Sequence, residues 1–225
     1  DFAVHVFPGY EVNWHHKIIA EKLEAVERGE IKRLMISLPP RFGKSELGSI
    51  LFPSWYLGRH PDREVIAASY AAELAVGFGR KTRNIIADQV YQGVFTTELA
   101  EDSKSAGRWN TNAGGAYVAA GVGGGITGRG ANILVIDDPI KDREEADSPV
   151  KQERAWDWYR STAYTRLAPN GAIVVIQTRW NEEDLSGKLL KEMKMGGDQW
   201  EIVQFPAIAE KDEQYRKAGE PLWPT

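Results

Sequence analysis

The sequence predicts an α/β domain in which helices flank both faces of a mainly parallel β-sheet. Two observations point to this class. Short apolar segments alternate along the chain with longer segments of helical periodicity, as in successive β-α-β units. The short segments are apolar throughout, which is typical of strands that are buried on both faces.

The first half of the chain contains elements of both kinds. They are, in order, a helix at 12–28, a strand at 32–38, a helix at 44–57, a strand at 64–69 and a helix at 71–87. Apolar residues at helical spacing indicate the first helix, which Gly29 should end. Pro53 is expected to kink the second helix or to end it early, because proline lacks an N–H group.

The second half continues this alternation. Its predicted elements are two short strands within 108–120, a glycine-rich loop at 121–130, a strand at 133–136, a helix at 148–167, a strand at 172–177, a helix at 182–193 and a strand at 201–205. Gly114 and Gly115 indicate a hairpin turn between the first two strands. Ser148 and Pro149 are typical of the capping position and first position of a helix.

Composition excludes several classes of protein. The 225 residues correspond to one large domain or a domain with an appendage. The net charge of −4 argues against a basic protein that coats nucleic acid. The chain has no cysteine, which excludes disulfides, cysteine-ligated metals and thiol catalysis. No apolar run reaches the roughly 18–20 residues needed to cross a membrane.

A phosphate-binding loop is predicted at 38–45, between a strand and a helix. Gly43, Lys44 and Ser45 match the end of the G-x-x-x-x-G-K-[ST] pattern, although Leu38 stands at its first glycine. The glycine allows close approach of the backbone to a phosphate, the lysine reaches the β- and γ-phosphates, and the serine can hold Mg²⁺. A chance match at a helix start is the alternative. The predicted nucleotide-binding residues here are Pro40, Arg41, Phe42, Gly43, Lys44, Ser45 and Glu46.

A pair of acidic residues follows the strand at 133–136. A nucleotide-hydrolysing domain needs a carboxylate at the end of an adjacent buried strand to position Mg²⁺, and often a second one for the attacking water. We expect Asp137 to bind the metal and Asp138 to polarise the water. Glutamate is more usual in the second role, so Glu144 and Glu145 are alternatives. A simple acidic turn after a strand is the non-functional interpretation.

Two polar segments are further candidates. Gln177, Thr178 and Arg179 end a strand, so their side chains should emerge at the carboxyl edge, where ligands bind in α/β folds. There they could sense the γ-phosphate, or simply form a polar strand end. Arg129, on the glycine-rich loop, could stabilise transition-state charge in a neighbouring subunit. A solvated loop arginine fits that position equally well.

Together these motifs resemble the ATPase domain of the terminase large subunit, the motor that packages double-stranded DNA in tailed bacteriophages. The resemblance rests on LPPRFGKS at 38–45, TGRGANILVIDDPIKD at 127–142 and VVIQTRWNEEDLSGKL at 174–189. It extends roughly from Asn13 to Trp223. It implies a P-loop NTPase fold with an ASCE/RecA-like core, and ATP hydrolysis to ADP and phosphate with Mg²⁺.

The resemblance also assigns roles to the phosphate-side residues. It implies that Lys44 and Ser45 are the phosphate and metal residues, and that Arg41 contacts the phosphates in cis. Asp137 corresponds to the Mg²⁺-associated acid. Asp138 corresponds to the catalytic acid, where the family usually has glutamate.

Two other regions take roles by resemblance. Gln177, Thr178 and Arg179 stand where the family has its coupling motif. The segment with Trp14, His15 and His16 corresponds to the adenine side of the site, although Trp14 is equally expected in the core.

Partners and domain limits also follow from the resemblance. It implies three partners: double-stranded DNA, the portal protein of the procapsid and the small terminase subunit. It also implies a location in the host cell cytoplasm, without association with a membrane. A homo-oligomeric ring is expected when docked, and mostly monomer in isolation. The family usually continues into a nuclease domain, so we assign 1–220 to the ATPase domain and 221–225 to the start of a linker. We expect no endonuclease activity from these residues.

Two other functions remain open on the sequence. One is a helicase-like, DNA-dependent ATPase, and the other is a nucleotide-responsive interaction module with little hydrolysis. Possible DNA contacts are equally open, since the best local candidates also suit an ordinary solvated helix face. These candidates are Arg80, Lys81 and Arg83.

Overall fold

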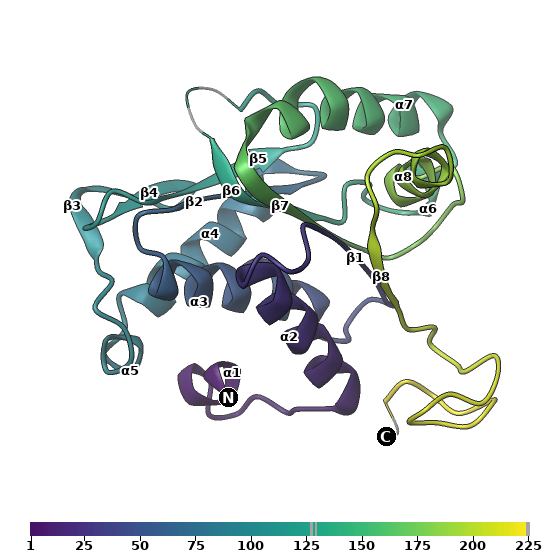
Figure 1. Ribbon diagram of the computed structural model, residues 1–225, viewed down its shortest axis with the longest axis horizontal. Helices are drawn as coiled ribbons and strands as arrows, with labels where there is room; N and C mark the ends of the chain where they lie inside the picture. The colour runs from purple at the N-terminus through teal and green to yellow at the C-terminus, as the bar shows by residue number, and fades with distance from the viewer. Residues whose placement is uncertain (127, 129, 224–225) are drawn as a thin grey trace.

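The computed structural model describes residues 1–126, 128 and 130–223, and these form a single eight-stranded sheet in the order β3-β4-β5-β2-β6-β7-β1-β8 (Figure 1). The strands are β1 (Arg33–Ser37), β2 (Glu64–Ser69), β3 (Leu99–Ser105), β4 (Arg108–Thr111), β5 (Ala116–Gly121), β6 (Ala131–Asp137), β7 (Leu167–Gln177) and β8 (Glu201–Gln204). From β5 to β8 all neighbours pair in parallel, whereas β3, β4 and β5 pair antiparallel. The predicted mainly parallel α/β fold is confirmed.

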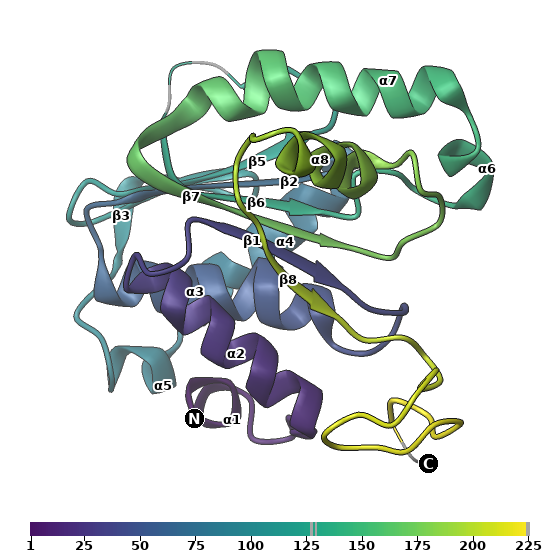
Figure 2. The same cartoon turned by 45° about the vertical axis from the view of Figure 1, so that its right-hand side comes forward.

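Helices cover both faces of this sheet. They are α1 (Phe2–Val6), α2 (Trp14–Glu27), the π-helical η1 (Glu46–Leu51), α3 (Phe52–Arg59), α4 (Ala72–Ile86), α5 (Gln89–Gln92), α6 (Arg143–Ala146), α7 (Pro149–Trp158) with its extensions η2 (Tyr159–Ala163) and η3 (Tyr164–Arg166), and α8 (Leu185–Lys194). Helices α2, α3 and α4 lie on one face, and α7 and α8 on the other (Figures 1 and 2). In the part of the chain that the structure describes, no helix has the length and apolarity to cross a bilayer.

The central strands are buried on both faces, as their uniformly apolar sequences predict. Along β7, Val174 and Ile176 belong to the core beneath α2 and α3. The alternate residues Ile173 and Val175 belong to the core beneath α7 and α8. Successive side chains of a strand point to opposite faces, so one strand supplies both cores.

The helix after the phosphate-binding loop differs from the prediction. It does not end at Pro53 but continues to Arg59. Its first part is the π-helix η1, and it changes to an α-helix at Phe52, whose N–H donates to the carbonyl of Leu47. Pro53 therefore lies in the first turn of α3, where its missing N–H costs little.

Strand β1, which precedes the phosphate-binding loop, and strand β6, which precedes the acidic pair, are not neighbours. This corrects the expectation that the acidic strand is adjacent to β1. Strand β7 lies between β1 and β6 and pairs in parallel with both. Its register places Ile176 opposite Asp137 and Gln177 opposite Ser37. The carboxyl ends of the three strands are therefore level, and the loops that follow them meet at one edge of the sheet.

Candidate active site

The phosphate-binding loop has an unusual backbone. Arg41 and Gly43 both have left-handed conformations, with φ of 70° and 78°. Such turns direct successive backbone N–H groups into a concavity that binds anions. Glycine adopts this conformation freely, whereas arginine does so at an energetic cost. The loop backbone is thus shaped for a phosphate, and the helix that follows directs its N-terminus at the same place.

Lys44 joins the loop to the ends of the other two strands. Its side chain is only 6% exposed. Its ammonium lies 3.0 Å from the hydroxyl of Thr178 and 3.2 Å from the carboxylate of Asp138. Three residues that the sequence analysis proposed from three separate motifs are therefore in direct contact at the carboxyl edge of the sheet.

Asp138 is held by main-chain contacts on both sides. Its φ is 42°, in the left-handed region. Its N–H donates to the carbonyl of Ile176 at 2.8 Å, and its carbonyl accepts from the N–H of Tyr70 at 3.1 Å. One carboxylate oxygen accepts from the N–H of Thr178 at 2.7 Å. The ends of β2 and β7 therefore fix this carboxylate beside Lys44.

The alternative acids lie elsewhere. Glu144 and Glu145 belong to the short helix α6. Glu145 pairs with Lys151 at 3.0 Å, and Glu144 is exposed. Among these three acids, the ion pair with Lys44 is made by Asp138, so the geometry favours Asp138 as the acid nearest the phosphate-binding loop.

Asp137 is a buried carboxylate with one unused oxygen. Its Oδ2 accepts from the hydroxyl of Ser49 at 2.5 Å, while its Oδ1 has no partner although it is shielded from solvent. Burial, and then the charge of Asp138, raise its pKa to about 7. The hydrogen bond from Ser49 opposes that rise, as do the nearby Ser45 hydroxyl and the charge of Lys44.

This environment fits a divalent cation. An unpaired, buried carboxylate oxygen beside a serine hydroxyl supplies the oxygen ligands that Mg²⁺ prefers, and a cation would offset the cost of burying the charge. Asp137 and Ser45 are therefore suited to hold the metal. Ser49 escaped the sequence analysis, although its position one helical turn after Ser45 places it on the same helix face.

The predicted sensing segment makes contacts in two directions. Of its three residues, Thr178 is the one that contacts Lys44. The amide of Gln177 donates instead to Asp184 at 2.8 Å, and Arg179 forms an ion pair with that carboxylate at 2.7 Å. Asp184 also accepts from the N–H of Gly187 and so caps α8. The segment thus connects the loop to α8 through a buried acid that the sequence analysis missed.

We expect Asp184→Asn to lower the free energy of unfolding by about 2 kcal/mol. Asparagine can still cap α8, but it brings no charge to Arg179 and replaces an acceptor that Gln177 and Arg179 share. Urea unfolding followed by circular dichroism measures the change. Asp142→Asn is the matched control, because Asp142 caps α6 with a side chain that is 44% exposed, and its effect should stay within about 0.5 kcal/mol. Equal effects of the two substitutions would contradict a special role for Asp184.

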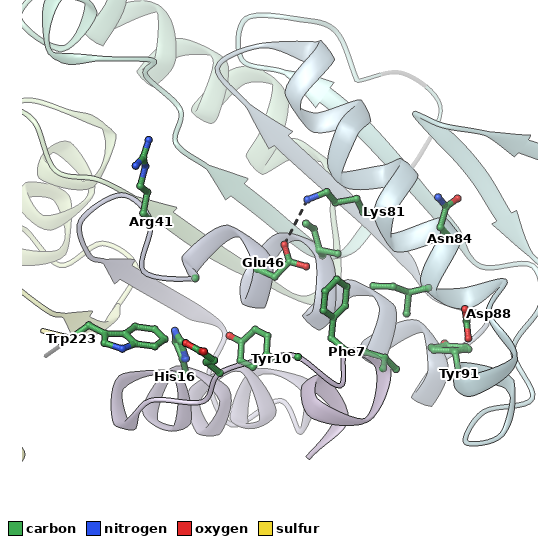
Figure 3. A pocket seen from close by; sticks show the side chains of 16 residues that line it. Phe7, Tyr10, His16, Arg41, Glu46, Lys81, Asn84, Asp88, Tyr91 and Trp223 are labelled. Carbon is green, nitrogen blue, oxygen red and sulfur yellow. Dashed lines mark ion pairs between the residues drawn. The ribbon is translucent and has the colours of Figure 1, made fainter. Parts of the chain in front are cut away.

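A pocket of about 660 Å³ opens beside the loop. It lies between the N-terminal segment, η1 and α4, and Figure 3 shows Glu46 and Lys81 on one side with Tyr10, His16 and Trp223 on another. Lys81 pairs with Glu46 at 3.7 Å. This lysine, a candidate for contact with DNA, therefore faces the pocket.

The aromatic residues of the predicted adenine side are placed differently from one another. Trp14 does not line the pocket; it stacks on Tyr215 with ring centroids 5.0 Å apart and also packs on Phe205. His15 lies behind the loop, with Nε2 3.3 Å from the carbonyl oxygen of Phe42. Tyr10 also lines the pocket, although no sequence motif pointed to it.

Arg129 lies outside the described residues. The preceding part of its loop is anchored, because Val122 donates to the carbonyl of Ser69 and Trp158 donates to the carbonyl of Gly124. Ile126 is buried in the core beneath α7. The part of the loop at 121–126 is therefore packed against the domain.

Comparison with protein families gives one match. Residues 35–225 match the family described as terminase large subunit, T4-like virus type, N-terminal. No curated protein matches the chain in sequence.

Solved structures of phage terminases share the fold. The large terminase of bacteriophage HK97 aligns with a TM-score of 0.60 at 14% identity, over 91% of this chain and 41% of its own. The large terminase ATPase domain of Thermus phage P74-26 aligns with a TM-score of 0.55 at 13% identity, over 92% of this chain and 84% of its own. The chain thus spans less than half of the HK97 protein. This likeness confirms the predicted fold, a mainly parallel sheet flanked by helices, as one that phage terminase ATPase domains share.

Proposed function

The chain belongs to the family of terminase large subunits of the T4-like virus type, and from this premise we propose that it is the ATP-hydrolysing motor domain that drives double-stranded DNA into a procapsid. The observation that carries the proposal is the convergence of Lys44, Thr178 and Asp138 at the carboxyl edge of the sheet. A loop shaped for phosphate, a lysine and an acid are the parts that phosphoryl transfer from ATP to water requires.

In the proposed reaction, the N–H groups of the loop and the Lys44 ammonium bind the β- and γ-phosphates. Asp138 accepts a proton from the water that attacks the γ-phosphorus, and ADP leaves. Asp137 and Ser45 would hold Mg²⁺, which would supply neutralisation of phosphate charge. Thr178 contacts Lys44 and belongs to the segment that reaches α8, so it is placed to respond to the loss of the γ-phosphate. The base of ATP is assigned to the pocket beside Tyr10.

The proposed partners are those of a packaging motor. They are double-stranded DNA, the portal protein of the procapsid and the small terminase subunit. We propose that the chain assembles into a ring when it docks, in the host cytoplasm. The net charge of −4 predicts weak binding of DNA by the isolated domain, because affinity for a phosphate backbone comes from clustered cations. Arg129 is proposed to act on the nucleotide of a neighbouring subunit.

Release of phosphate from ATP by the purified chain tests the proposal. We expect Mg²⁺-dependent turnover, and binding of a non-hydrolysable ATP analogue in equilibrium dialysis. Binding without turnover would instead favour a nucleotide-responsive interaction module. Failure to bind the analogue would overturn the assignment. Unwinding of duplex DNA would favour the helicase-like alternative, and translocation without strand separation the packaging motor.

We expect Arg41→Ala to lower the rate at saturating ATP about 100-fold, while affinity for a non-hydrolysable analogue changes much less. Arg41 is exposed on the loop, and in Figure 3 its side chain points away from Tyr10 and Phe7. A guanidinium there can meet charge that develops on the γ-phosphate.

The control for this prediction is Arg41→Gly, because glycine adopts the observed φ of 70° without strain. Equal losses in both variants would assign the effect to the guanidinium. An active glycine variant would show that backbone strain, rather than the missing side chain, causes the loss in Arg41→Ala. An unchanged rate in both would place Arg41 outside catalysis.

A further inference from the structure

Helix α2 contacts the phosphate-binding loop through His16, which also lines the pocket beside the loop. The loop has no glycine at its first position, where Leu38 is buried in the core. Instead, the side chain of His16 in the first turn of α2 meets the loop at its centre. Its Nε2 lies 3.1 Å from the carbonyl oxygen of Phe42. This contact joins elements 26 residues apart in the sequence.

The direction of this hydrogen bond follows from the other ring nitrogen. The N–H of Asn13 donates to Nδ1 of His16 at 3.2 Å, as part of the capping box of α2. A neutral imidazole whose Nδ1 accepts must carry its proton on Nε2. Nε2–H therefore donates to the Phe42 carbonyl. Burial lowers the pKa of His16 and outweighs the contacts with the backbone of Phe42 and Glu11 that raise it, so the neutral form is favoured.

The contact also determines which way the next N–H group points. In a trans peptide, the carbonyl of one residue and the N–H of the next point in opposite directions. With the Phe42 carbonyl turned towards His16, the N–H of Gly43 points away from that ring. If this peptide rotated, a carbonyl oxygen would replace the N–H in the anion site and repel a phosphate.

The positions of His16 and Gly43 depend on each other through packing. A Cβ atom at Gly43 would lie 2.7 Å from Nε2 of His16, so the imidazole occupies the space that the glycine leaves. On its other side, His16 packs on Trp223 with ring centroids 5.3 Å apart. His15 also reaches the Phe42 carbonyl, at the longer distance of 3.3 Å, but its Nδ1 has no partner. Of the two histidines, His16 is therefore the one whose tautomer is fixed by a second contact.

We propose that His16 is a positioning residue for nucleoside triphosphate binding, which holds the Phe42 carbonyl against α2 so that the Gly43 N–H faces the phosphates. The inference rests on the proposed function, because it names a determinant of that same phosphate site. The usual first glycine of such a loop is replaced by Leu38, and the contact from α2 would fix the loop backbone in its place.

Two substitutions separate this role from helix capping. Asparagine at position 16 can accept at the place of Nδ1 and preserve the cap, but it is too short to reach Phe42. Glutamine can place an amide N–H where Nε2 lies. For His16→Asn we expect the Kd of a non-hydrolysable ATP analogue to rise about tenfold, the effect of roughly one lost hydrogen bond. For His16→Gln we expect most of that affinity to return.

The measurement uses the full chain, with isothermal titration calorimetry for the Kd and urea unfolding for stability. Equal affinity in the two variants, whether reduced or unchanged, would overturn the proposal. A second measurement needs no variant: ¹⁵N chemical shifts of the wild-type imidazole should show His16 protonated at Nε2, and protonation at Nδ1 would also overturn it. If the wild-type chain binds no ATP analogue, the proposed function fails, and this inference fails with it. Tight wild-type binding with no difference between variants removes only the role of His16.

Discussion

Replacing Lys44 by alanine is expected to abolish ATP turnover, leaving less than about 1% of the wild-type rate at saturating ATP. Removal of one preorganised donor that meets transition-state charge costs roughly 10²–10³ in rate. Lys44 also balances the charge of Asp138 at 3.2 Å, so its loss leaves that carboxylate facing the phosphates without a counter-ion. Two effects therefore act in the same direction.

Phosphate release under single- and multiple-turnover conditions measures the effect. Lys217→Ala is a suitable control, because Lys217 is exposed, lies far along the chain from the loop and, within the described residues, forms its ion pair with Asp212. It should keep the wild-type rate. A folded Lys44→Ala protein with at least half of the wild-type turnover would refute the assignment of this lysine.

Asp138→Asn is expected to reduce hydrolysis by roughly 10²–10⁴-fold, the usual contribution of a general base, while a non-hydrolysable analogue still binds. Asparagine can retain the hydrogen bond from the N–H of Thr178, which is 2.7 Å long in the wild type. It cannot take a proton from water. The loss should therefore appear in the rate at saturating ATP rather than in affinity.

The alternative acids supply the controls for this experiment. Glu144→Gln and Glu145→Gln should each change the rate by less than about twofold, since neither carboxylate is paired with the loop lysine. If Glu145→Gln abolished turnover and Asp138→Asn did not, the water-activating role would pass to α6. That result would require α6 to move towards the loop when nucleotide binds.

The sequence predicted the parts of the site that depend on strand ends. Local apolar runs located β1, β6 and β7, and parallel strands bring their carboxyl ends to one edge, which is where Lys44, Asp138 and Thr178 are in contact. Sequence order does not reveal sheet order, which is why β7 was not expected between β1 and β6. Gln177 is the last residue of β7 and Thr178 lies beyond it, and only the chain path beyond the strand shows which of them reaches the loop.

Other features were missed because their sequences carry little apolar pattern. Strand β3 is largely polar, and α1, α5 and α6 have four or five residues each. Short helices depend on tertiary contacts more than on their own propensity. Trp14 illustrates the converse problem: an aromatic residue near a binding motif serves equally well in packing, and only the positions of Tyr215 and Phe205 decide between the two.

The polar edge strand β3 has a consequence for contacts between copies of the domain. Its backbone is open to strand addition, but its side chains include Glu101, Asp102 and Lys104, and its register with β4 is irregular. Charges and bulges of this kind oppose edge-to-edge growth of a sheet and hence amyloid-like aggregation. The opposite edge, β8, is only four residues long. When many copies of the domain are crowded together, they should therefore contact one another through helices and loops. Such contacts can dissociate without breaking backbone hydrogen bonds between strands of two copies.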